Sequence, residues 1–273
     1  MKAMLFLLLS LPAMAVIHGI DDRHETNDPG ISALLSELAL SSPMIVEKIR
    51  LVPKGDHFEA QGTLLSKIGF CPDARYAEQK SVARCSSSLV GEDLILTAGH
   101  CVDEDLKKWC SEYSVVFDFK TGNTKEIPKE NVYHCKEVIY RVFDEPFGED
   151  LSLIRLSRKV TNRTPIKISN SLNVGEKLSM IGYPLGIPQK IVDDGEVTMT
   201  GPLKYSFRHT VDSFSCNSGG PLFNTRGEQV GVLVRGTGQD FSNPENRKCY
   251  DWTLGKNSDY TEANSLLHLK LPR

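Results

Sequence analysis

The sequence predicts an all-β protein built from two antiparallel barrels, and three observations support this prediction. From about Met44 onward, short apolar segments are separated by turn residues, a pattern typical of short strands. Strands and helices do not alternate along the chain, as they would in a parallel α/β sheet. Ser218 stands before a strand and lacks the Gly-x-Ser-x-Gly elbow of α/β-hydrolases, because Cys216 occupies the place of the first glycine.

Residues 44–160 are expected to form the first barrel. Pro and Gly separate its predicted strands, as turns between strands require. The segments with strand character are Met44–Ile49, two within Ser86–Thr97 that are separated at Gly91–Asp93, Tyr113–Phe119, Glu137–Arg141 and Leu151–Leu156.

Residues 161–273 are expected to form the second barrel and a C-terminal tail. Its predicted strands are Lys177–Tyr183, Gly195–Thr200, Leu203–Phe207, Leu222–Phe223 and Val230–Arg235.

The N-terminus predicts export from the cytoplasm. Residues 1–15 resemble a signal peptide, with Lys2 as the positive end, an apolar run and a small-residue cleavage site at Ala13-Met14-Ala15. The apolar run is shorter than the roughly 20 residues that cross a bilayer. Residues 16–43 are interpreted as an N-terminal arm or prosegment, with a short helix over Ile31–Leu40; a poorly ordered leader is the alternative. The protein is therefore expected to be secreted or periplasmic.

Composition and charge also limit the classes of partner that we expect. The chain has 273 residues, 40% of them hydrophobic, and a net charge of -3 without a Lys/Arg block. This balance predicts a soluble monomer with no membrane span and no nucleic-acid partner. The histidines are scattered, so neither a metal site nor a cofactor is expected.

Seven cysteines fit an oxidising compartment, although their sequence positions do not assign the pairs. Because seven is odd, at least one is expected to be unpaired or to pair between molecules.

Three residues point to nucleophilic catalysis. His100 closes an apolar strand, Asp150 opens another, and Ser218 precedes two glycines. A serine hydroxyl needs a base to remove its proton, and the base needs a third group to fix its tautomer. Each residue alone has an ordinary structural explanation. Together they predict a catalytic triad.

The stretches Thr97-Ala98-Gly99-His100-Cys101, Asp150-Leu151-Ser152-Leu153 and Asn217-Ser218-Gly219-Gly220-Pro221 resemble the motifs of chymotrypsin-like serine peptidases. Phe70–Gln79 and Ile181–Lys190 resemble a secreted bacterial subgroup related to glutamyl endopeptidases. The resemblance implies two six-stranded antiparallel β-barrels with the active site between them. It also implies a Cys85–Cys101 disulfide and a protein or peptide substrate.

By this resemblance, Ser218 attacks a peptide carbonyl, His100 transfers the proton, and Asp150 orients His100. The amides of Ser218 and Cys216 form the oxyanion hole. Cys216 replaces the glycine of the family, and a Cβ is unfavourable at positive φ. Two outcomes stay open: the loop keeps its conformation at some cost, or the amide turns away and leaves a catalytically impaired binding protein.

Asn217 replaces the aspartate of trypsin-like enzymes. Its neutral amide cannot form an ion pair with a new N-terminal ammonium, so activation by N-terminal insertion is not expected. A further hypothesis is a periplasmic peptidase that matures by trimming before about Ile49.

Three residues are candidates for substrate binding. Asp212 lies six residues before Ser218, where trypsin-like enzymes carry a carboxylate that selects Lys or Arg, and Ser213 follows it. A turn aspartate is the alternative. Arg235 is interpreted either as a partner for an acidic substrate group or as a solvated arginine. His209 lies before the nucleophile loop, whereas glutamyl endopeptidases take their pocket histidine from the strand after it.

Overall fold

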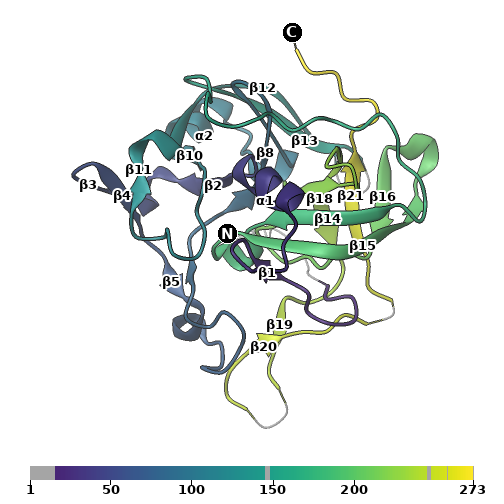
Figure 1. Ribbon diagram of the computed structural model, residues 1–273, viewed down its shortest axis with the longest axis horizontal. Helices are drawn as coiled ribbons and strands as arrows, with labels where there is room; N and C mark the ends of the chain where they lie inside the picture. The colour runs from purple at the N-terminus through teal and green to yellow at the C-terminus, as the bar shows by residue number, and fades with distance from the viewer. Residues whose placement is uncertain (1–15, 145–147, 245–246, 257, 273) are drawn as a thin grey trace, which may run out of the picture.

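Two β-barrels lie side by side in the computed structural model, which describes residues 16–144, 148–244, 247–256 and 258–272 (Figure 1). The predicted all-β class is confirmed. The expected signal peptide, residues 1–15, lies outside the described residues.

The first barrel is a seven-stranded sheet whose two edges come from one chain segment. Residues 85–91 pair with β2 through their first half and with β9 through their second half. The break falls at Ser87, whose buried hydroxyl donates to the Pro43 carbonyl at 2.8 Å. Counted as one interrupted strand, this segment gives the expected six. In spatial order the strands are β7 (Cys85–Ser86), β2 (Met44–Glu47), β10 (Tyr113–Val116), β12 (Val132–Phe143), β13 (Asp150–Leu156), β9 (Leu94–Thr97) and β8 (Ser88–Gly91).

The second barrel has six strands and is closed by pairing of its first and last members. A short seventh strand, β1 (His24–Glu25), joins its edge from the N-terminal arm. The six are β15 (Lys190–Thr200), β14 (Lys177–Gly182), β17 (Pro221–Phe223), β18 (Gln229–Gly236), β21 (Thr261–Ser265) and β16 (Ser206–His209).

The remaining described elements are short and lie outside the barrel walls. Three small sheets are formed by β3 (Leu51–Lys54), β4 (His57–Ala60) and β11 (Ile127–Pro128), by β5 (Thr63–Leu64) and β6 (Lys80–Ser81), and by β19 (Phe241–Ser242) and β20 (Asp251–Trp252). The helices are α1 (Ala33–Leu40), α2 (Leu106–Glu112) and the 3₁₀ turns η1 (Lys48–Arg50), η2 (Leu65–Ile68), η3 (Gly99–Cys101), η4 (Lys129–Asn131), η5 (Pro184–Gly186) and η6 (Pro202–Lys204).

Most predicted strands are present, and the differences have local causes. The strand predicted to start at Leu203 starts at Ser206, because Leu203 and Lys204 have positive φ and form a turn. The sequence analysis missed α2, which is mostly polar, and β21, whose Thr-Glu-Ala-Asn-Ser lacks the apolar alternation of a strand.

The N-terminal arm is ordered against the second barrel. The N–H of Val16 donates to the Ser213 carbonyl at 2.9 Å, and the Ser213 N–H donates back at 3.0 Å. The helix predicted within Ile31–Leu40 is present as α1, whose N-cap Ser32 accepts from the Leu35 N–H. Its apolar side chains pack on β14, β15 and β17. Residues 16–43 thus contact the second barrel through backbone pairing and apolar packing.

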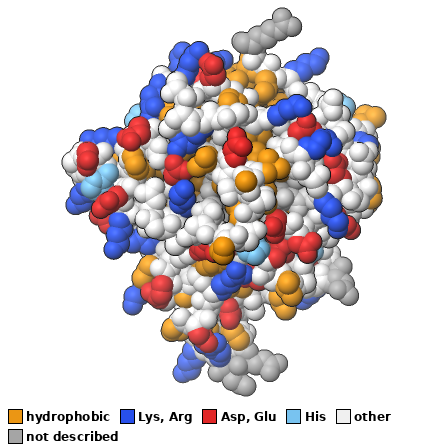
Figure 2. Space-filling view, in the orientation of Figure 1, with side chains coloured by type: hydrophobic (Ala, Val, Ile, Leu, Met, Phe, Trp, Pro, Cys, Tyr) orange, Lys and Arg blue, Asp and Glu red, His pale blue; other side chains and the backbone are white. Residues whose placement is uncertain are grey.

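Three disulfides cross-link the chain, and all seven cysteines are described. They join Cys71 to Cys249, Cys85 to Cys101 and Cys110 to Cys135, while Cys216 is free. Among the described residues, no helix has the length and apolar character needed to cross a membrane. Charges of both signs are interspersed over the face in Figure 2.

A buried lysine fixes β1 to the second barrel. Lys190 is 1% exposed, and its Nζ donates to Glu25 Oε2 at 3.2 Å, Gln79 Oε1 at 2.8 Å and the Pro188 carbonyl at 2.7 Å. Burial lowers the pKa of Lys190 to about 8, although Glu25 partly opposes the shift.

This lowered pKa predicts alkaline stabilisation. Between about pH 8 and pH 10.5 the unfolded chain holds a proton that Lys190 has already lost in the folded protein. The free energy of unfolding should therefore rise across that window, by at most about 3 kcal/mol from this group. Urea unfolding of wild type and Lys190→Met at several pH values measures the difference. Parallel pH profiles for the two proteins would contradict the prediction.

Candidate active site

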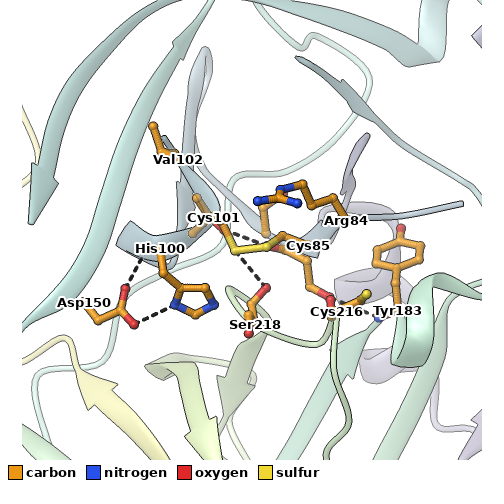
Figure 3. Close-up of a disulfide and its surroundings, with 12 residues drawn as sticks. Arg84, Cys85, His100, Cys101, Val102, Asp150, Tyr183, Cys216 and Ser218 are labelled. Carbon is orange, nitrogen blue, oxygen red and sulfur yellow. Dashed lines mark hydrogen bonds and ion pairs between the residues drawn. A yellow bond between two sulfur atoms is a disulfide. The ribbon is translucent and has the colours of Figure 1, made fainter. Parts of the chain in front are cut away.

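His100 is held near the end of a strand by two hydrogen bonds to one carboxylate. It lies in η3, directly after β9. Its backbone N–H donates to Asp150 Oδ1 at 2.9 Å, and its Nδ1 lies 2.7 Å from Asp150 Oδ2 (Figure 3). Because a carboxylate accepts, the proton belongs on Nδ1, which leaves Nε2 as the basic nitrogen on the side of Ser218.

The preceding glycine permits this approach. A Cβ on Gly99 would lie 1.8 Å from the Val142 carbonyl oxygen and 3.1 Å from Asp150 Oδ1. Only glycine therefore lets the histidine turn pack against β12 and the aspartate.

Asp150 is fixed from the second barrel. Its side chain is almost fully buried at the start of β13, and its backbone N–H donates to Asn264 Oδ1 at 2.6 Å. Asn264 lies on β21, and the sequence analysis missed it because nothing local marks an asparagine as a partner 114 residues away.

Ser218 lies in a tight turn that contacts the first barrel. The Ser86 N–H donates to the Ser218 carbonyl at 2.8 Å. Gly219 follows at φ 85°, and a Cβ there would lie 2.0 Å from Thr97 Oγ1. The triad candidates His100, Asp150 and Ser218 are thus brought together between the barrels. Although all are described, no hydrogen bond joins His100 Nε2 to Ser218 Oγ, a contact that often tightens only when substrate binds.

Cys216 has the left-handed conformation that its place in the turn requires. Its φ is 68°, although it carries a Cβ. Its carbonyl accepts from the Ser86 hydroxyl at 3.0 Å, so the first barrel holds this residue too. In the described chain, neither the Cys216 amide nor the Ser218 amide donates to a protein acceptor.

The thiol of Cys216 is uncharged at neutral pH. Desolvation raises its pKa to about 12, and the nearby Asp240 carboxylate adds to this shift. Asp240 also accepts from the Ser215 N–H at 2.8 Å and from its hydroxyl at 2.5 Å. The sequence analysis missed this second anchor of the turn.

The nearest group of metal-ligand types is Cys85, His100 and Cys101. The two cysteines form a disulfide and offer no thiolate, while His100 is bonded to Asp150. This group therefore has no ligand set for zinc.

The three substrate-binding candidates all contact the protein itself. Asp212 is 2% exposed, and its Oδ1 accepts the His18 N–H at 2.7 Å. Burial raises the pKa of Asp212 to about 8, and the neighbouring Asp22 carboxyl contributes to this shift. Ser213 pairs with the N-terminal arm through its backbone.

The Arg235 side chain is 20% exposed and pairs with an acidic residue of the protein itself. Its Nη1 donates to Glu262 Oε1 at 2.8 Å, and its Nη2 lies 3.4 Å from the Gly148 carbonyl oxygen. These contacts hold the chain segment just before Asp150 in place.

Two cavities lie outside this cluster. One of about 400 Å³ is lined by His209 and His18, and burial lowers the pKa of His209 to about 3, which keeps it neutral. A larger one of about 1050 Å³ lies behind Asp150, where Leu151, Asn264 and Leu269 line it. Neither is lined by Ser218 or His100.

Comparison with known proteins gives a consistent result. A family model described as a trypsin-like peptidase domain matches residues 85–232. Exfoliative toxin A of Staphylococcus aureus is 32% identical over 166 residues, which are 56% of this chain and 56% of the toxin. The chain thus spans about half the length of this curated relative.

Several solved structures share the fold. A Glu endopeptidase in complex with MPD has a TM-score of 0.54 at 15% identity, with 92% of this chain and 93% of that chain covered. The Vibrio cholerae VesB protease has a TM-score of 0.53 at 13% identity, with 90% and 64% covered. Mouse neuropsin, a serine protease, has a TM-score of 0.51 at 16% identity, with 84% and 90% covered.

The strain at Cys216 generates a prediction. A non-glycine residue in the left-handed region costs on the order of 1 kcal/mol. Cys216→Gly should therefore be about 1 kcal/mol more stable to urea than Cys216→Ala, which also lacks the thiol but keeps the Cβ. Equal unfolding midpoints for the two variants would show that the turn stores no such strain.

Proposed function

The chain belongs to the trypsin-like peptidase family, and from this premise we propose that it is a serine endopeptidase acting on proteins or peptides. The observation that carries the proposal is the pair of hydrogen bonds from His100 to the buried Asp150, with Nε2 left on the side of Ser218. This arrangement prepares a base beside a serine hydroxyl, and a serine peptidase needs that base.

In the proposed mechanism, Ser218 Oγ forms a bond to the substrate carbonyl carbon while its proton passes to His100 Nε2. The carbonyl electrons move onto oxygen, where the amides of Cys216 and Ser218 donate to the oxyanion. When the C–N bond breaks, the leaving amine takes the proton from His100 and an acyl-enzyme remains. Water then attacks the ester, with His100 again as base, and releases the acid and Ser218. Asp150 orients His100 and stabilises the imidazolium throughout.

A second candidate is a binding protein on a peptidase fold that does not cleave. The Cβ of Cys216 at positive φ favours it, because strain in this turn favours rotation of the amide away from the hole. The contact between the Cys216 carbonyl and Ser86 opposes that rotation, so we favour the enzyme.

We also propose that the protein acts outside the cytoplasm. The three disulfides support this, since such bonds persist mainly in oxidising compartments. Residues 1–15 would direct export, either to a periplasm or out of the cell. A monomer and removal of an N-terminal segment remain predictions.

Labelling with a fluorophosphonate tests the function. Purified wild type should form an adduct at Ser218, located by peptide mass, and should hydrolyse a casein substrate. Ser218→Ala and His100→Ala should lose the adduct and at least about a thousandfold in kcat, because the triad acts as a unit. Ser111→Ala, at an exposed serine of α2, is the control and should behave as wild type. A folded wild type without adduct would instead support the binding protein.

Specificity for Lys or Arg at the cleavage site forms a separate proposal. Asp212 keeps a proton at neutral pH, so it attracts a cation only when alkaline pH removes that proton. We therefore expect the kcat/KM ratio of an Arg substrate to its neutral citrulline analogue to rise above neutral pH. In Asp212→Asn this ratio should not change with pH. A preference for Arg that is constant from pH 6 to pH 9 would contradict this role of Asp212.

A further inference from the structure

A fully buried arginine of the N-terminal arm lies under the nucleophile loop. Arg23 is 0% exposed, and its guanidinium carbon lies 4.0 Å from the ring centroid of Phe214 and 3.8 Å from that of Trp252. The two rings meet edge to face, with centroids 4.9 Å apart. The cation thus contacts two aromatic faces away from water, where such contacts are strongest.

The rest of the arm fixes the position of this guanidinium. Arg23 Nε and Nη2 donate to the two carboxylate oxygens of Asp21 at 2.8 and 2.6 Å. The Arg23 carbonyl accepts from the Tyr76 hydroxyl at 2.9 Å and from Arg75. A bidentate pair and an anchored carbonyl leave the side chain little freedom to move.

Phe214 connects this arginine to the catalytic turn. It lies four residues before Ser218, and its carbonyl accepts the Asn217 N–H at 3.0 Å. The turn that contains Cys216 is therefore closed on the backbone of the residue that Arg23 contacts.

Trp252 is fixed on the opposite side. Its Nε1 donates to the Arg75 carbonyl at 2.7 Å, and its ring lies 5.0 Å from that of Phe70. Phe70 precedes Cys71, and the Cys71–Cys249 disulfide links this segment to the one that contains Trp252. Arg23 is thus packed between these disulfide-linked segments and the nucleophile loop.

We propose that Arg23 is a positioning residue that fixes the Phe214–Ser218 turn in its oxyanion-binding form. It acts through Phe214 and does not touch the substrate. The inference rests on the proposed function for its effect on catalysis, whereas its effect on the turn can be measured without turnover. The N-terminal arm then contributes to the active site although it supplies no triad residue.

The test replaces Arg23 by Leu or Lys. Replacement of a second arginine, Arg163, by Leu serves as the matched control. The Arg163 side chain is 4% exposed, pairs with Asp118 at 2.5 Å and lies 4.5 Å over the Phe117 ring, so these contacts are with the first barrel. Arg163→Leu therefore removes a similar buried cation. Thermal unfolding of all variants establishes that each is folded at the assay temperature.

Two measurements report on the conformation of the Phe214–Ser218 turn in these variants. The first is the rate at which N-ethylmaleimide labels Cys216, the free cysteine. The second is the fluorophosphonate inactivation rate, with kcat and KM measured separately.

In Arg23→Leu we expect Cys216 labelling to change by at least about tenfold and kcat to fall by about tenfold or more with little change in KM, because a displaced turn misplaces the reacting groups. Arg23→Lys keeps the charge but lacks the planar stack and should be intermediate. Arg163→Leu should lose stability while both readouts stay at the wild-type level.

Wild-type thiol labelling in folded Arg23→Leu would overturn the proposal, as would equal changes in Arg163→Leu. If Arg23→Leu does not fold, Arg23→Lys and Phe214→Leu decide by the same two readouts. If wild type forms no fluorophosphonate adduct, the proposed function fails, and thiol labelling alone still decides the role of Arg23.

Discussion

The contacts of Ser86 join the two halves of the candidate active site. Its N–H donates to the Ser218 carbonyl, and its hydroxyl donates to the Cys216 carbonyl and accepts the Tyr183 N–H. It also follows Cys85, whose disulfide partner Cys101 follows His100. One short strand of the first barrel therefore fixes both the histidine and the nucleophile turn, so the docking of the barrels sets the geometry between them.

The sequence predicts those parts of this arrangement that depend on residues next to each other in the chain. Gly99 and Gly219 stand beside His100 and Ser218 because any side chain there would collide with backbone or Thr97. Such local constraints produce motifs. Asn264 and Arg23 act through contacts with residues more than a hundred positions away, and no local pattern marks them. The two antiparallel barrels could be expected from the family resemblance, whereas β21 could not be identified from its polar residues.

Spacing alone was a weaker guide to specificity. Asp212 has the expected distance from Ser218 along the chain, yet its carboxyl accepts the His18 N–H, and burial together with Asp22 raises its pKa. Arg235 pairs with Glu262. Sequence separation indicates where a Cα lies relative to Ser218, but the charge and direction of a side chain depend on what packs against it. Here the N-terminal arm is what packs there, and its place could not be read from spacing.

The arm also explains how the nucleophile turn is ordered with a neutral Asn217. Asn217 Oδ1 is buried and accepts no hydrogen bond from any residue that the structure describes. The Val16 N–H donates instead to Ser213, and Ile17 is buried beside Phe214. Strand-like pairing and apolar burial thus hold the arm, with no ion pair at Asn217. The Val16 nitrogen donates to Ser213 in this arrangement, and it would still have a proton to donate there as the ammonium that cleavage after Ala15 would create. The order of the turn then depends on the neighbours that touch it directly, among them Ser86, Asp240 and Arg23.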